Sequence, residues 1–147
     1  MGRGLSELQK AILKLSWDEL EEWRNANIEV RKDPELLAEW RAVYVGHVKP
    51  VPKKFAVMAK DNWLGLIDVR DIFVKVYGWH LRERSYGATY FSKAEIGVKP
   101  YMAAYIAVRK SLDRLVARGL IYDSHGGRYS GYSLTTKGQD LMTKLGK

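Results

Sequence analysis

The chain contains no cysteine, and this absence excludes several kinds of chemistry. Without a thiol there is no disulfide, no zinc site built from thiolates and no cysteine nucleophile. A chain with no disulfide is typical of a reducing compartment, so we expect a cytoplasmic protein. Residues 1–4 lead directly into an amphipathic segment, from which we expect no signal peptide.

Long apolar runs and the usual catalytic motifs are also missing. No apolar run approaches the roughly 20 residues that cross a bilayer, so we expect no membrane partner. His47, His80 and His125 stand alone, without the His-x-x-x-His or Glu-x-x-His spacing of common metal sites. The sequence has neither a phosphate-binding loop leading into a helix nor a Gly-x-Ser-x-Gly elbow. We therefore expect no metal, no cofactor and no enzymatic activity.

Acidic residues are scarce in the second part of the chain. Residues 1–62 carry 11 Lys/Arg and 10 Asp/Glu, whereas residues 63–147 carry 14 Lys/Arg and only 7 Asp/Glu. A basic part joined to a nearly neutral one favours a polyanionic partner such as nucleic acid, although surplus lysine also serves solubility. At 147 residues, of which 46% are hydrophobic, the chain is long enough to bury a core as one domain, residues 1–147.

The clearest periodic pattern lies in residues 99–122. Its apolar residues recur at three- and four-residue steps, which is typical of one face of a helix. They are Tyr101, Ala104, Val108, Leu112 and Leu115. Pro100 suits the first turn of this helix, and Gly119 suits its end, because glycine adopts the left-handed conformation that commonly follows a helix. Residues 120–122 then predict a short strand.

A hairpin and a last helix are predicted after this strand. Two β-like runs flank a glycine-rich turn within residues 123–135. Thr136 is expected to cap a helix over residues 137–145. Earlier in the chain, Ser6 is expected to cap a first helix over residues 5–26, and Asp68 to cap another over residues 69–78.

This order of helix, strand, glycine-rich hairpin and closing helix resembles the winged helix-turn-helix fold of MarR- and PadR-like regulators. The residues that carry the resemblance are 108–121, similar to the end of a recognition helix, and 132–141, similar to a wing-exit strand and its helix. The resemblance covers residues 64–145. It implies an α+β, mainly α fold in which residues 63–147 hold a first strand at 63–68, the helix-turn-helix, the wing and the closing helix.

Two segments have no counterpart in this resemblance. Residues 27–62 are expected to form an insertion between the first and second core helices, serving as a hairpin, a dimerisation element or a contact for another protein. Within it, Asp33 and Pro34 predict the start of a short helix, and residues 43–48 predict a strand. Residues 79–98 form a long connection with a predicted helical turn from Ser92.

The resemblance implies that the outward side of the helix at 99–118 contacts DNA. The expected contacts in this helix are Ala103, Ile106, Ala107, Arg109, Lys110 and Arg114, and those in the wing are His125, Arg128 and Tyr129. Apolar side chains suit thymine methyl groups, and lysine or arginine suits guanine and phosphate. Alternatively, Ile106 packs against the insertion or a partner subunit, and the wing is an ordinary hairpin.

The function implied is sequence-specific binding of double-stranded DNA by a homodimeric transcription regulator. Two alternatives stay open, because a fold does not fix its use. One is a winged helix that serves protein–protein assembly. The other is an accessory factor for single-stranded nucleic acid, since five Trp and nine Tyr interleaved with cations suit base stacking.

Overall fold

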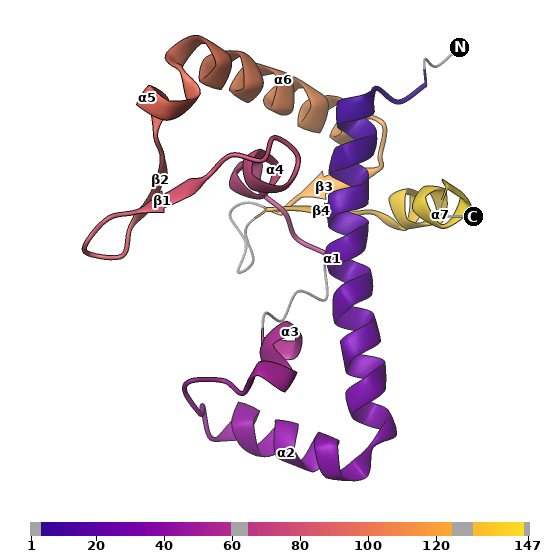
Figure 1. The fold of residues 1–147 in the computed structure, drawn as a ribbon. Coiled ribbons are helices and arrows are strands. Elements are labelled where there is room, and N and C mark those ends of the chain that lie inside the picture. The colour runs from indigo at the N-terminus through magenta and orange to yellow at the C-terminus, as the bar shows by residue number, and fades with distance from the viewer. Residues whose placement is uncertain (1–3, 60–64, 125–130, 146–147) are drawn as a thin grey trace.

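The computed structural model describes residues 4–59, 65–124 and 131–145. These residues form a mainly helical structure with two small antiparallel sheets of two strands each, so the expected α+β, mainly α class is confirmed (Figure 1). The helices are α1 (Glu7–Lys32), α2 (Pro34–Val45), α3 (Ala56–Ala59), α4 (Val69–Lys75), α5 (Lys93–Ile96), α6 (Val98–Ala117) and α7 (Thr136–Leu145). The strands are β1 (Leu81–Glu83), β2 (Thr89–Phe91), β3 (Ile121–Asp123) and β4 (Tyr132–Leu134), and a 3-10 turn, η1 (Lys53–Phe55), precedes α3.

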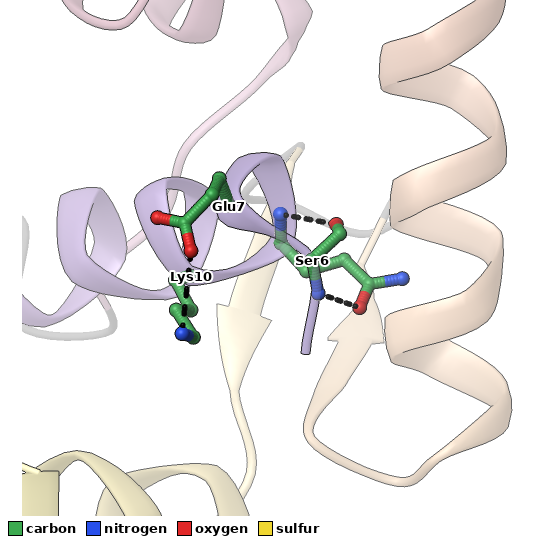
Figure 2. A network of polar contacts seen from close by, with 4 residues as sticks. Ser6, Glu7 and Lys10 are labelled. Atoms are coloured by element: carbon green, nitrogen blue, oxygen red, sulfur yellow. Dashed lines mark hydrogen bonds and ion pairs between the residues drawn. The ribbon is translucent and has the colours of Figure 1, made fainter. Parts of the chain in front are cut away.

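Helix α1 begins as predicted but continues beyond the predicted end at residue 26. The Ser6 hydroxyl accepts a hydrogen bond from the Gln9 backbone N–H, and the Gln9 side chain accepts one from the Ser6 N–H, both at 3.1 Å (Figure 2). This capping box satisfies two N–H groups that no helical carbonyl reaches. The helix runs on to Lys32 because residues 27–32 contain no glycine or proline and because buried Val30 anchors its last turns.

The main hydrophobic cluster forms where the first half of α1 meets α4, α6, α7 and the β3–β4 sheet. Its fully buried side chains include Ile12 and Leu13 of α1 and Val108, Leu112 and Leu115 of α6. The apolar stripe predicted for residues 99–118 is therefore the buried face of α6.

A second, smaller cluster forms around the last half of α1. Val30, Phe55 and Met58 are buried there, with side chains of α2 packed against them. The Asp33 carboxylate accepts hydrogen bonds from the Glu35 and Leu36 N–H groups at 3.0 and 3.3 Å, which confirms the predicted start of α2. The part of the insertion that the structure describes is thus mostly helical and folds back alongside α1 (Figure 1).

The strand predicted over residues 43–48 is wrong. Residues 43–45 belong to α2, which ends at Val45 with Gly46 as its C-cap. Valine and tyrosine favour strands locally, but Val43 continues the helical spacing of Leu36 and Trp40, and all three pack against the second cluster. Tertiary packing decides this segment.

The first strand expected at residues 63–68 is not formed over its described part, residues 65–68, where Ile67 alone makes a β-bridge to the hairpin. Ile67 and Tyr132 exchange two backbone hydrogen bonds of 3.0 and 2.8 Å. Strands β3 and β4 pair with Ile121 opposite Leu134. Residues 63 and 64 lie outside the described part of the chain.

Local capping was predicted correctly for α4 and α6 and wrongly for α7. Asp68 and Asp71 form a capping box at the start of α4. After α6, Gly119 takes a φ of +74°, as predicted. Helix α7 is capped by Thr135 and not, as predicted, by Thr136. The Thr135 hydroxyl accepts a hydrogen bond from the Gly138 N–H at 3.0 Å and donates one to the Gly119 carbonyl at 2.6 Å. Thr135 thereby joins the end of the hairpin to the end of α6.

The connection over residues 79–98 contains a hairpin that the sequence did not predict. Leu81 pairs with Phe91 and Glu83 with Thr89, and the Ser92 hydroxyl caps the short helix α5 as predicted. Each strand has three residues and β1 is wholly exposed, so no alternation of apolar and polar residues marks it.

Gly138→Ala should destabilise the protein. A Cβ at this position would lie 2.1 Å from the Leu120 carbonyl oxygen, so α7 would have to move away from the hairpin. Overpacking should lower the free energy of unfolding by about 3 kcal/mol, whereas the higher helix propensity of alanine should raise it by about 1 kcal/mol. We expect urea unfolding to show a net loss of about 2 kcal/mol in the free energy of unfolding.

Asp140→Ala is the matched control, because Asp140 lies exposed on the same helix. Its effect should stay within about 0.5 kcal/mol. Equal stability of the Gly138→Ala and wild-type proteins would contradict the close approach of α7 to Leu120.

Candidate nucleic-acid interface

The outward face of α6 gathers most of the residues expected to contact DNA. Ala103, Ile106, Lys110 and Arg114 are exposed, and Ala107 is half-buried at the edge of the same face. The side chain of Ile106 is 50% exposed, and the insertion helices α2 and α3 lie at the other end of the molecule from α6 (Figure 1). Because the opposite face of α6 is locked into the main cluster, these five side chains stay turned to solvent.

Arg109 lies differently from its neighbours. It is half-buried at the edge of α6 that faces the β3–β4 sheet, and its Nη1 donates a hydrogen bond to the Tyr132 hydroxyl at 3.2 Å. Tyr132 itself is buried, and burial raises the pKa of its hydroxyl above the ordinary value of 10.0. The hydroxyl therefore stays protonated at neutral pH and holds the guanidinium between helix and hairpin.

Cations line the second half of the outward face. Within the described residues, neither Lys110 nor Arg114 has a carboxylate oxygen within 4.0 Å. This holds even though the exposed Asp113 lies between them on the same helix. Lys137 donates to the Arg118 carbonyl at 2.9 Å and adds a further positive charge beside the end of α6. Positive side chains without an acidic partner favour an anionic ligand.

The first half of the same helix exposes large apolar side chains that the sequence analysis did not single out. Val98 is 61% exposed, Met102 46% and Tyr105 42%. Together with Ile106 they recur at four, seven and eight residues, so a second apolar stripe was present in the sequence. The buried stripe of α6 has the same period, so periodicity alone does not distinguish the two stripes.

The three expected wing residues, His125, Arg128 and Tyr129, lie outside the described residues. The base of their hairpin is described on both sides. The Ser124 N–H and hydroxyl both donate to the Gly131 carbonyl at 2.8 Å. Gly131 has a φ of +140°, and a Cβ there would meet the Ile67 carbonyl at 2.9 Å, so glycine is required at this exit from the hairpin.

Among the described residues, no group of three or more histidine or acidic side chains is arranged to hold a metal ion. None of the helices in the described ranges combines the length and apolar character needed to cross a membrane. Comparisons of the chain with models of protein families, with curated proteins and with solved structures find no match.

Tyr132→Phe should loosen the contact between α6 and the hairpin. The substitution removes the hydroxyl that accepts from Arg109, and a hydrogen bond to a charged donor contributes about 1.5 kcal/mol. Chemical denaturation should show a loss of about 1 kcal/mol in the free energy of unfolding, because Arg109 is half-buried and regains some water.

Tyr122→Phe, on the same hairpin but 39% exposed, should leave stability unchanged. If both variants unfold like the wild type, the bond between Arg109 and Tyr132 does not stabilise the protein.

Proposed function

We propose that the protein binds double-stranded DNA sequence-specifically through a winged helix-turn-helix within residues 63–147, and that it regulates transcription. In this assignment α4 and α6 are the two helices of the motif, α6 is the recognition helix, and the β3–β4 hairpin is the wing. The bridge between Ile67 and Tyr132 supports the assignment, because it joins the segment before α4 to the strand after the wing.

The observation that carries the proposal is the outward face of α6. A helix with its side chains is about 10–12 Å across and the major groove is about 12 Å wide, so a helix with one free face fits the groove. Ala103 and Ala107 allow the helix backbone to approach the base edges. Ile106 suits a thymine methyl group and Lys110 suits guanine, while Arg114 lies further along the helix, where phosphates follow.

The distribution of charge supports one orientation on the duplex. Four of the six acidic residues of α1 lie close together in its middle, at Asp18, Glu19, Glu21 and Glu22. Helix α2 lies at the far end of α1 from α6 (Figure 1). Phosphates would repel the acidic middle of α1, so the molecule would approach DNA with α6 leading.

We further propose that the protein acts as a homodimer on two half-sites, as helix-turn-helix regulators commonly do. Candidate dimer contacts are α1, α7 and the helical insertion.

The exposed apolar stripe of α6 favours a second candidate function, a winged helix that binds another protein. Val98, Met102, Tyr105 and Ile106 would then form an apolar contact. Such binding persists at high salt, whereas binding to phosphates weakens steeply with salt. Preference for a single strand over its duplex would instead favour the accessory role in single-stranded nucleic acid.

Fluorescence anisotropy with a random duplex and with its single strand, at low and moderate salt, tests the proposal. We expect tighter binding to the duplex, with a slope of log affinity against log salt near −0.9 for each phosphate neutralised. No binding to either the duplex or the single strand at low salt would contradict DNA binding.

Removing two cations from α6 should weaken this binding. For Arg109→Ala combined with Lys110→Ala we expect an affinity about tenfold lower and a salt slope that is shallower by about 1 to 2. Lys110→Ala alone keeps the bond between Arg109 and Tyr132, so its loss of affinity reports the missing lysine only. We expect this loss to be smaller than that of the double variant.

Arg31→Ala combined with Lys32→Ala is the matched control, since it also removes two adjacent cations but at the far end of α1. An equal loss in this control would mean that total charge, and not α6, governs binding. Unchanged affinity of the α6 variants would exclude this helix from the interface.

A further inference from the structure

We propose that the β1–β2 hairpin is a second DNA-contacting arm, which binds phosphates of the duplex beyond the segment that α6 covers. This inference rests on the proposed function and extends it to residues that the sequence analysis did not assign. The hairpin lies at the end of α6 where the helix begins, and the β3–β4 hairpin lies at the end where it stops (Figure 1).

The base of the hairpin is fixed to the body by aromatic packing. The Trp79 ring stacks on Tyr101 in the first turn of α6, with centroids 5.9 Å apart and planes at 18°. Phe91, the last residue of β2, meets Phe73 of α4 edge-on at 5.6 Å. Since an isolated two-stranded hairpin is marginal in water, these contacts give the arm its fixed origin.

Two polar contacts set the direction of the hairpin. The Arg82 guanidinium donates to both carboxylate oxygens of Glu95 in α5, at 2.8 and 2.6 Å. This pair raises the pKa of Arg82 and lowers the pKa of Glu95, so both stay charged at neutral pH. Arg70 of α4 donates to the Thr89 hydroxyl at 3.0 Å. The hairpin is therefore tied to the helices on both sides of it.

Beyond these ties the hairpin buries nothing. Residues 81–88 are all exposed, and Tyr86 in the turn is 76% exposed. The turn is nevertheless closed, with the Arg84 N–H donating to the Ala88 carbonyl at 2.8 Å and Gly87 at a φ of +90°. The turn is ordered and its base is anchored, but it contributes nothing to the hydrophobic core. Such a turn is suited to contact a partner.

The side chains of the arm match a phosphate backbone. Residues 79–93 hold three Lys/Arg and one acidic residue, Glu83, but Arg82 is paired with Glu95 just outside this range. The Arg84 guanidinium lies over the Tyr90 ring, 4.3 Å from its centroid, and this cation–π contact holds it in place. Within the described residues Arg84 makes no ion pair within 4.0 Å. Planar guanidinium groups bind phosphate oxygens well, and Tyr86, two residues after Arg84 in the turn, adds an exposed hydroxyl donor.

The reach of the arm decides which phosphates it meets. Strands of three residues are about 10 Å long, close to the about 12 Å width of the major groove, so an arm that starts beside the first turn of α6 is long enough to meet the backbone that flanks the groove. The partner is therefore the flanking duplex, and the contact adds affinity without sequence information.

The experiment compares two duplexes of random sequence, about 30 and about 12 base pairs long, roughly three turns and one turn of the helix. The variant is Arg84→Ala combined with Tyr86→Ala, and both residues are exposed, so the fold should persist in circular dichroism. We expect its affinity for the long duplex to fall about fivefold, with a salt slope shallower by about 1, and its affinity for the short duplex to stay unchanged.

Arg41→Ala combined with Tyr44→Ala is the matched control, because it removes the same two residue types from exposed positions on α2. It should leave both affinities unchanged. Glu83→Gln should strengthen binding to the long duplex, since it removes the acid of the arm.

Three other outcomes would contradict the proposal that the β1–β2 hairpin contacts the flanking duplex. Equal affinities of the variant and the wild type on the long duplex would place the hairpin away from DNA and leave the proposed function standing. An equal loss on both duplexes would place the contact within the central site. Wild-type protein that binds no duplex would overturn the arm together with the proposed function.

Discussion

The structure depends on the packing of one face of α6 against the first half of α1. Val108, Leu112, Ile12 and Leu13 are fully buried in this contact region, and burying a side chain of this kind contributes about 1.5–3 kcal/mol. Helix α4, the β3–β4 sheet and α7 complete the same cluster. Because this face of α6 is fixed, its other face has one orientation in solution, and cationic and apolar side chains on it form a surface of defined shape.

Helix α1 is long enough to take part in both hydrophobic clusters and to hold them apart. Its first half belongs to the main cluster and its last half to the small cluster around Phe55, where α2 packs. One rigid helix thus holds the insertion at a distance from α6 (Figure 1). The insertion adds helices and not the strand predicted for residues 43–48, so a dimer or partner contact there would use helical surfaces. On the proposed interface, the basic end of the molecule meets DNA and the insertion remains accessible.

Short polar contacts join the candidate interface to the core. Arg109 reaches the Tyr132 hydroxyl, Thr135 joins the end of the hairpin to Gly119, and Arg82 ties β1 to Glu95 just before α6. Each of these contacts connects α6, or the segment next to it, with one of the two hairpins. A surface of this kind is held in one arrangement before any ligand binds, which reduces the entropy lost on binding.

The sequence by itself determined the features that depend on neighbours along the chain. These are the Ser6 and Asp68 caps, the Gly119 stop, and the exposed face of α6, which follows from the buried stripe as its complement. The tertiary structure alone decided the helical state of residues 43–45, the end of α1 at Lys32, the β1–β2 hairpin and the place of Arg109. Each of those depends on partners far away in sequence, such as Phe55 for α2, Tyr101 for Trp79 and Tyr132 for Arg109. Local propensities cannot specify such contacts, because they form only when the whole chain has packed.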